Sequence, residues 1–160
     1  MKTLTLTGIW IYPIKSLGGI RLDSAKVREK GLEFDRRWML VDDQGIFLTQ
    51  RNLPQMALFK LSMDNGQMTI TKKEPTIKPG AISFGINTTP KGSPMPVMIW
   101  KDEVTAMEVD PEISQWFSDQ MGFSCRLVSF PENSARPVDA DYKVNDENVS
   151  LADAYPFLII

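Results

Sequence analysis

The sequence has 160 residues, of which 42% are hydrophobic and 24% are charged, and its formal net charge is -2. This length and composition are typical of a globular protein with one domain, or with one domain and part of a second. The charge predicts neither a nucleic-acid nor a membrane partner, because no overall basic field would attract one, and no apolar run approaches the roughly 18 residues of a membrane span.

The chain contains no histidine and one cysteine, Cys125. The missing histidine excludes His-ligated metals and Ser-His-Asp or Cys-His catalysis within this chain. A single cysteine cannot form an intrachain disulfide, which fits a reducing, cytoplasmic setting. Cys125 stands at the start of a predicted strand, so we expect a buried structural residue and not a metal ligand.

Short segments with period-two alternation and β-branched residues predict strands along most of the chain. These predicted strands are residues 3–12, 20–27, 38–41, 46–49, 58–63, 67–71, 81–86, 97–100, 104–107 and 125–130. Polar turn signals separate them, at residues 29–31, 42–45 and 101–103 and most clearly at Asn65-Gly66, where both residues tolerate positive φ. We expect all four tryptophans, Trp10, Trp38, Trp100 and Trp116, to lie in the core.

One clear helix is predicted late in the chain. Asp110 is a capping residue, Pro111 suits the first helical position, and Gly122 suits the end. A shorter helical turn is predicted at residues 54–57. Many short strands with one helix near the end predict a mainly β fold, a barrel or sandwich.

The last thirty residues differ in character from the rest. Residues 131–148 are polar and predict a long loop, whereas residues 154–160 are among the most apolar of the chain. An apolar end needs covering structure. We therefore expect a fragment, with a β-barrel domain at residues 1–130 and, at 131–160, a linker and the beginning of a truncated second β domain.

Three segments place cations at predicted strand ends: Lys15-Ser16, Arg36-Arg37 and Arg51. Pro13 ends the first strand, so Lys15 is held just beyond it. In a hairpin, the start of one strand lies beside the end of its partner, so Arg36 or Arg37 should neighbour Arg51. Such cations would suit a phosphate. The alternatives are a solvated Lys15 and a structural ion pair between Asp35 and Arg36 or Arg37.

A family resemblance rests on the segments that carry these cations. Residues 11–16 (IYPIKS), 31–41, 45–49, Arg51 and Pro54, in this order, resemble the N-terminal β-barrel domain that precedes MOSC domains. This family includes molybdenum cofactor sulfurases, the mitochondrial amidoxime-reducing component and bacterial YcbX-like proteins. Residues 151–160 resemble the opening of the MOSC domain itself.

The resemblance implies a molybdenum–pterin cofactor, bound between this region and the C-terminal MOSC domain of the same chain. By position in the motifs, Lys15 and Arg36 would contact the cofactor's phosphate and pterin. Arg51 is a weaker candidate, and Ser16 and Arg37 are weaker still. The molybdenum-ligating cysteine would lie in the MOSC domain, so the fragment alone is expected to be inactive and to bind the cofactor weakly or not at all.

The function implied is that of an oxidoreductase that reduces small N-hydroxylated substrates with electrons from a donor protein or domain. One alternative is a sulfurtransferase in cofactor or metal-cluster assembly, although nothing here matches the pyridoxal-phosphate domain of the larger sulfurases. Another alternative is a non-catalytic barrel that recognises a substrate or partner. Arg136, in the long loop, is a further candidate for contact with the cofactor or the MOSC domain.

Overall fold

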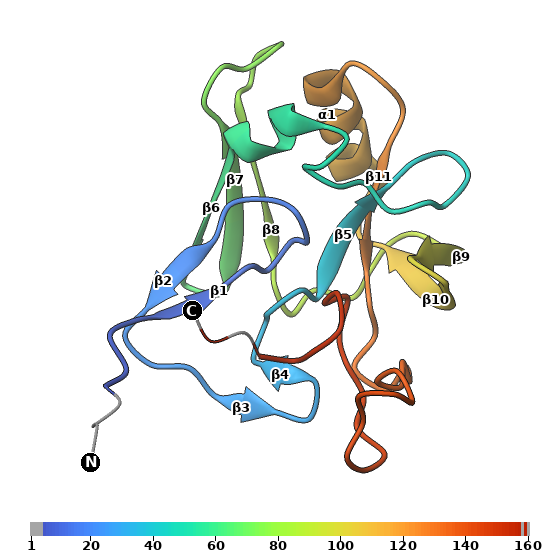
Figure 1. Cartoon of the computed structure of the whole chain (residues 1–160). Coiled ribbons are helices and arrows are strands. Elements are labelled where there is room, and N and C mark those ends of the chain that lie inside the picture. The colour runs from blue at the N-terminus through green and yellow to red at the C-terminus, as the bar shows by residue number, and fades with distance from the viewer. Residues whose placement is uncertain (1–4, 158, 160) are drawn as a thin grey trace.

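A computed structural model describes residues 5–157 and residue 159, and its regular elements are mostly short strands joined by loops (Figure 1). The strands are β1 (Ile9–Ile11), β2 (Ile20–Leu22), β3 (Val27–Arg28), β4 (Gly31–Leu32), β5 (Trp38–Val41), β6 (Phe59–Asp64), β7 (Gln67–Lys72), β8 (Ala81–Gly85), β9 (Pro94–Ile99), β10 (Asp102–Glu108) and β11 (Arg126–Ser129). The helices are the short 3-10 helix η1 (Pro54–Leu58) and α1 (Pro111–Met121). The predicted mainly β fold with one helix near its end is confirmed.

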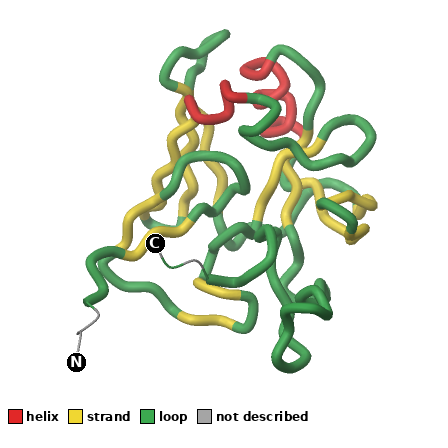
Figure 2. The backbone as a smooth tube through the Cα atoms, in the orientation of Figure 1, coloured by secondary structure: helices red, strands yellow, loops and turns green. Residues whose placement is uncertain are grey.

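Two larger antiparallel sheets form the body of the molecule. One has the strand order β5-β11-β10-β9, and the other has the order β6-β7-β8. The ribbons β1-β2 and β3-β4 lie at the lower left in Figure 1, and α1 lies at the top between the two sheets. Long loops join these elements, as the green segments of Figure 2 show.

Strand β5 runs through the middle of the core, because all four of its side chains are buried. Trp38 and Leu40 belong to one apolar cluster, with Phe59 of β6 and residues of α1. Met39 and Val41 belong to a second cluster on the other side of β5. Successive side chains of a strand point to opposite faces, so one strand supports both clusters.

The helix α1 begins and ends where the sequence predicts. The Asp110 carboxylate accepts a hydrogen bond from the Glu112 amide at 2.9 Å, and Gly122 ends the helix with a left-handed φ of 82°. The Ser114 hydroxyl accepts a 3.2 Å hydrogen bond from the Leu127 amide of β11. This contact ties the helix to the sheet that contains β5.

The segment predicted as a returning strand, residues 46–49, forms isolated bridges and no ladder. Leu48 donates its amide to the Leu40 carbonyl at 2.8 Å, while Phe47 donates to the Met98 carbonyl at 3.1 Å. The segment thus bonds alternately to β5 and β9, the two edge strands of their sheet. It joins these edges, and the sheet curls into a barrel-like shape.

Two other strand predictions are too long. Residues 5–8 are not part of a strand, and β1 contains only Ile9–Ile11, whereas residues 3 and 4 lie outside the described residues. The predicted strand 20–27 is divided, because β2 pairs with β1 and β3 pairs with β4. Neither strand continues where its partner ends.

The predictions for the β9–β10 turn and for two tryptophans were also wrong. The register pairs Ile99 with Asp102, so the turn consists of Trp100 and Lys101, and Trp100 has a φ of 56°. Trp100 is 44% exposed and Trp10 is 52% exposed, because one sits in this turn and the other on the open face of a two-stranded ribbon. Trp38 and Trp116 are buried, as predicted.

The segment after β11 has little regular structure but packs against the barrel. Pro137 and Asn148 form an isolated bridge, and Leu151 is fully buried in the same cluster as Val41. The segment, orange to red in Figure 1, comes back up to the lower end of β5. The predicted boundary at residue 130 stays a prediction.

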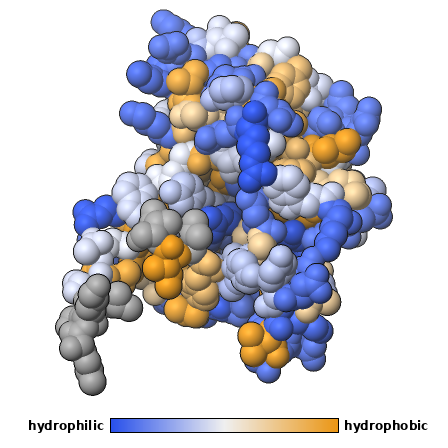
Figure 3. Space-filling view, in the orientation of Figure 1, coloured by the Kyte–Doolittle hydropathy of each residue, from blue (hydrophilic) through white to orange (hydrophobic). Residues whose placement is uncertain are grey.

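None of the helices within residues 5–157 has the length and hydrophobicity that a membrane span requires. On the face drawn in Figure 3, apolar side chains form separate patches among hydrophilic ones.

Candidate functional site

Lys15 is held in place by the backbone that follows β1. Its amide donates a 2.8 Å hydrogen bond to the Trp38 carbonyl at the start of β5, and Ser16 turns the chain with a φ of 64°. Lys15 is only 6% exposed, and its ammonium group pairs with the Asp153 carboxylate. Burial lowers the pKa of Lys15, although the hydrogen bond and the charge of Asp153 oppose this shift.

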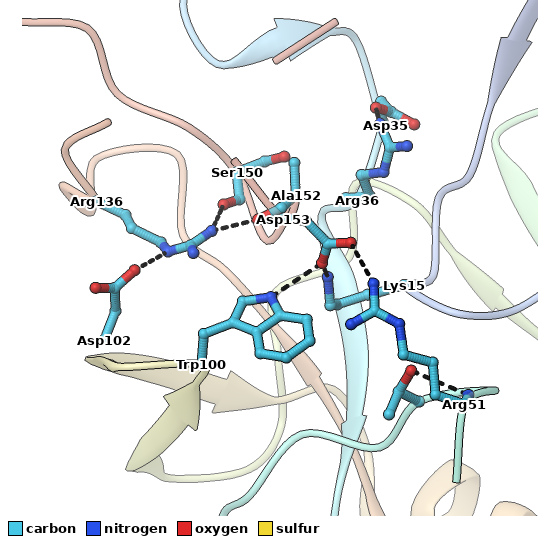
Figure 4. Close-up of polar contacts among 11 residues, drawn as sticks. Lys15, Asp35, Arg36, Arg51, Trp100, Asp102, Arg136, Ser150, Ala152 and Asp153 are labelled. Carbon is cyan, nitrogen blue, oxygen red and sulfur yellow. Dashed lines mark hydrogen bonds and ion pairs between the residues drawn. The ribbon is translucent and has the colours of Figure 1, made fainter. Parts of the chain in front are cut away.

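Three donors from distant parts of the chain converge on Asp153 (Figure 4). Lys15 and the indole nitrogen Nε1 of Trp100 bond to carboxylate oxygen Oδ1, the latter at 3.0 Å. Arg51 lies 3.7 Å from the other oxygen, Oδ2. We call Lys15, Arg51, Trp100 and Asp153 the Asp153 site.

Charge and burial have opposite effects on Asp153. Partial burial raises the pKa of Asp153. The hydrogen bond and charge of Lys15, with smaller contributions from Trp100 and Arg51, together lower the pKa by more than burial raises it. The pKa of Asp153 is therefore below its ordinary value, and the carboxylate is an anion at neutral pH. The Asp153 site thus holds an oxyanion among donors.

Aromatic rings support the cations of the Asp153 site. The Lys15 ammonium lies 5.6 Å from the centroid of the Phe47 ring, and the Arg51 guanidinium lies 4.8 Å from that of Trp100. The two rings are themselves in contact, with centroids 4.9 Å apart. Each cation gains favourable contact with a ring face, which partly offsets its lost hydration. A cleft of about 540 Å³, lined by Phe47, Trp100 and Asp153 among others, borders the site.

Arg36 lies beside the Asp153 site but is paired elsewhere. Its guanidinium bonds to Asp35, which is 4% exposed, and lies 5.4 Å from the ring centroid of Tyr12. Asp35 also accepts the Tyr12 amide at 2.7 Å. The alternative of a structural Asp35–Arg36 pair is therefore what the structure shows. The charge of Arg36 still reaches Lys15, whose pKa it helps to lower.

The remaining predicted residues contribute differently. Ser16 accepts a 2.9 Å hydrogen bond at its carbonyl from the Gln50 side chain. Arg37 is 4% exposed and contacts Glu132, in a different pocket from that beside Asp153. The expected neighbour of Arg51 was Arg36 or Arg37, but the described contacts of its guanidinium are with Asp153 and Trp100.

Arg136 is a buried anchor for the segment that carries Asp153. Its Nε donates to Asp102 of β10 at 2.9 Å, and its Nη1 donates to the carbonyls of Ser150 and Ala152 at 2.8 and 2.6 Å. Figure 4 shows the Arg136 guanidinium to the left of Asp153, beside Ser150 and Ala152. The Nε and Nη1 donors of Arg136 thus bond to protein groups, and a contact of Arg136 with a cofactor or with the MOSC domain stays a prediction.

The sequence reasoning missed Asp153 and Trp100. Asp153 is a lone carboxylate within an apolar stretch, Leu151–Phe157, and that isolation was the available signal. Trp100 was assigned to the core, because its place in a two-residue turn depends on the register of β9 and β10.

No group of three potential metal-ligating side chains occurs in the part of the chain that the structure describes. Cys125 is 1% exposed, and burial raises the pKa of its thiol to about 11. Such a thiol is neutral at physiological pH, so Cys125 suits a structural role and not thiolate ligation.

The chain is similar in sequence to curated proteins of two kinds, an amidoxime-reducing component and molybdenum cofactor sulfurases. The chain is 28% identical to mouse (Mus musculus) mitochondrial amidoxime-reducing component 1 over 98% of its length and 47% of the mouse protein. It is 28% identical to a silkworm (Bombyx mori) molybdenum cofactor sulfurase, over 98% of this chain and 20% of that protein. For the Emericella nidulans molybdenum cofactor sulfurase, the identity is 32% over 78% of this chain and 17% of the fungal protein.

The chain thus spans about half the length of the mouse relative and a fifth of the silkworm one. The solution structure of a Bordetella bronchiseptica protein shares the fold with a TM-score of 0.54, at 14% identity over 72% of this chain and 94% of that one. The family model described as "MOSC N-terminal beta barrel domain" matches residues 3–124. The chain therefore belongs to the MOSC N-terminal β-barrel domain family.

Proposed function

We propose that this chain forms the cationic wall of a molybdenum–pterin cofactor site in an enzyme that reduces N-hydroxylated compounds. The observation that carries the proposal is the convergence of Lys15, Arg51 and Trp100 on one carboxylate. The amidoxime-reducing relative supports the reductase activity. The MOSC domain, an electron donor and the substrate are the partners of this proposal.

The donor set fits the phosphate of that cofactor. Lys15 and the Trp100 indole donate hydrogen bonds to an oxyanion, and the Arg51 guanidinium lies 3.7 Å from the same carboxylate. Arginine can grip a phosphate with two parallel hydrogen bonds, and lysine adds a point charge. The cations that hold Asp153 would hold the phosphate, with Arg36 adding to the local positive potential.

The bound cofactor would supply oxygen-atom transfer at molybdenum. The residues of this chain bind and orient it: burial of Lys15 reduces competition from water, and the Phe47 and Trp100 rings fix the positions of the cations. Cys125 is buried and neutral, so the proposal assigns the metal-binding thiolate to another part of the protein.

The test compares Lys15→Met, Arg51→Met and Asp153→Asn in the intact protein, with Arg126→Met as a control. Arg126 is an exposed arginine of β11. Each lost charged hydrogen bond should weaken cofactor binding by about 1.5–3 kcal/mol, or roughly tenfold or more. Molybdenum by elemental analysis and pterin by fluorescence report the bound amount.

The variants separate binding from a structural role. If the cations serve only to hold Asp153, then Lys15→Met and Asp153→Asn will lower stability equally and leave the cofactor content unchanged. If the proposal is right, Lys15→Met and Arg51→Met lower the cofactor content, whereas Asp153→Asn and Arg126→Met do not. Unchanged content in both cation variants would favour a non-catalytic recognition barrel.

A sulfurtransferase is the second candidate, because several relatives are molybdenum cofactor sulfurases. It requires a cysteine that carries a persulfide. The buried thiol of Cys125 is poorly suited, so a persulfide would be expected elsewhere in the protein. Mass spectrometry of the intact protein, with and without reductant, distinguishes the candidates by a reducible gain of one sulfur atom.

A further inference from the structure

A second pocket, away from the Asp153 site, contains a buried arginine with free donors. The pocket has a volume of about 380 Å³ and lies between β8, β10 and β11. Arg37 lines it and is only 4% exposed. All three guanidinium nitrogens of Arg37 are inaccessible to solvent and make no hydrogen bond with the residues that the structure describes.

The one described ion pair of Arg37 involves Nε and leaves the Nη1 and Nη2 donors of the guanidinium without a partner. Its Nε lies 3.1 Å from the Glu132 carboxylate, whose side chain is 74% exposed. Buried charged groups without hydrogen bonds are costly, so such groups usually have a partner. The Nη1 and Nη2 amino groups of Arg37 therefore call for an acceptor that enters the pocket.

The local charge favours an anion with a single charge. Lys30 is 3% exposed and lies close by, but it donates to the carbonyls of Pro131 and Glu132. Burial lowers the pKa of Lys30, and the neighbouring charge of Arg37 lowers it further, while Glu132 and Glu29 oppose the shift. Glu132 and Glu29 balance the two cations, so the pocket offers one buried guanidinium and no surplus of positive charge that would hold a dianion.

The rest of the lining favours an apolar body on that anion. Aromatic and aliphatic side chains make up much of the wall, with few polar ones; the apolar residues include Phe34, Trp38, Phe84, Ile86, Val109 and Phe130. A concave apolar site with a few convergent polar groups is the usual form of a small-molecule pocket, and the volume is within the usual range.

We propose that this pocket, the Arg37 pocket, binds a small organic carboxylate with an aromatic or branched apolar body. The carboxylate would take two parallel hydrogen bonds from Nη1 and Nη2, the geometry that the guanidinium fork matches. A phosphate dianion fits less well, because the charges around Arg37 balance and the wall is largely apolar. This site is independent of molybdenum binding.

The test uses 2-naphthoate as the probe and isothermal titration calorimetry on the intact protein. The neutral 2-naphthamide and the dianionic 2-naphthyl phosphate have the same ring system. The proposal predicts saturable binding of 2-naphthoate, and binding of both other probes that is weaker by roughly tenfold or more. Equal binding of the amide would overturn the role of Arg37, and tighter binding of the phosphate would overturn the assignment to a carboxylate.

Variants locate the binding. Arg37→Met should weaken 2-naphthoate binding by roughly 10- to 100-fold, whereas Arg126→Met, a change of an exposed arginine, should leave it unchanged. If Arg37→Met does not fold, Asn87→Asp is the second variant, because it adds a repelling charge at an exposed position of the pocket. An affinity that survives both changes, or no binding of 2-naphthoate at all, would refute the proposal.

Discussion

The substitution Arg136→Met should release the segment that carries Asp153 from the barrel. Arg136 is 4% exposed and donates to Asp102 and to the carbonyls of Ser150 and Ala152. Methionine has a similar length and fills much of the same space, but it donates no hydrogen bond. The variant therefore leaves two buried carbonyls without their charged donor.

The magnitude follows from these contacts. Each hydrogen bond from the charged group to a carbonyl contributes about 1.5–3 kcal/mol. The ion pair with Asp102, whose side chain is 34% exposed, adds at most about 1 kcal/mol because solvent screens it. Removing the buried charge also removes its desolvation penalty, which offsets part of the loss. We expect a net decrease in the free energy of unfolding of roughly 2–4 kcal/mol.

Two measurements check this prediction. Urea denaturation gives the free energy of unfolding, and hydrogen exchange shows where protection is lost. The amides of Val149 and Leu151 bond to the carbonyls of Arg136 and Arg36 at 2.9 and 3.0 Å, so their protection should fall more than that of β6 and β7. Arg126→Met should change the stability by no more than about 0.5 kcal/mol. A loss below that figure in Arg136→Met, or an equal fall in protection everywhere, would refute the anchoring role.

Three further predictions concern single groups. The lowered pKa of Asp153 stabilises the folded state above the unfolded pKa of about 4, and this contribution is lost as the pH falls through the folded value. Asp153→Asn should therefore lower the free energy of unfolding at pH 6, by under about 1 kcal/mol because the group is half exposed. The difference from the unchanged protein should vanish in urea titrations near pH 2, and a difference that persists there would contradict the lowered pKa of Asp153. The thiol of Cys125, with its pKa of about 11, should resist iodoacetamide at pH 8 until urea unfolds the chain. The free energy of unfolding should fall as the pH rises from the unfolded thiol pKa of about 8.5 toward 11, and Cys125→Ser should not show this loss. Removal of the helix cap by Asp110→Ala should cost about 1 kcal/mol and Asp110→Asn less, because asparagine keeps the acceptor; equal losses on thermal unfolding would argue against the capping hydrogen bond.

Local signals predicted the elements that depend on local physics. The cap at Asp110 and the turn at Asn65-Gly66 lie where they were expected, because each is determined by a few neighbouring residues. Strand β5 was predicted with its observed bounds, because a short, continuous apolar run between polar turn residues is typical of a strand that is buried on both faces. The segment 46–49 was not, because its two hydrogen-bonding partners are far apart in sequence.

The candidate site was predicted in part. The positions of Lys15 and Arg51 at strand ends suggested an anion, and both cations lie beside one, the carboxylate of Asp153. The sequence could not show that this anion belongs to the same chain, 138 residues from Lys15. It also could not show that adjacent Arg36 and Arg37 serve different pockets, because that depends on the turn in which Arg36 has a φ of 50°.

Reading the residues alone was enough to predict the fold class, the helix, the absence of histidine chemistry and the family. These properties follow from periodicity, composition and motif order, all of which are local or additive along the chain. The pairing of charged groups was visible only in three dimensions: Asp153 meets Lys15 and Arg51, and Arg136 meets the carbonyls of Ser150 and Ala152. These contacts depend on how the sheet curls and on where the long loop after β11 packs, and the spacing of nearby residues does not predict either.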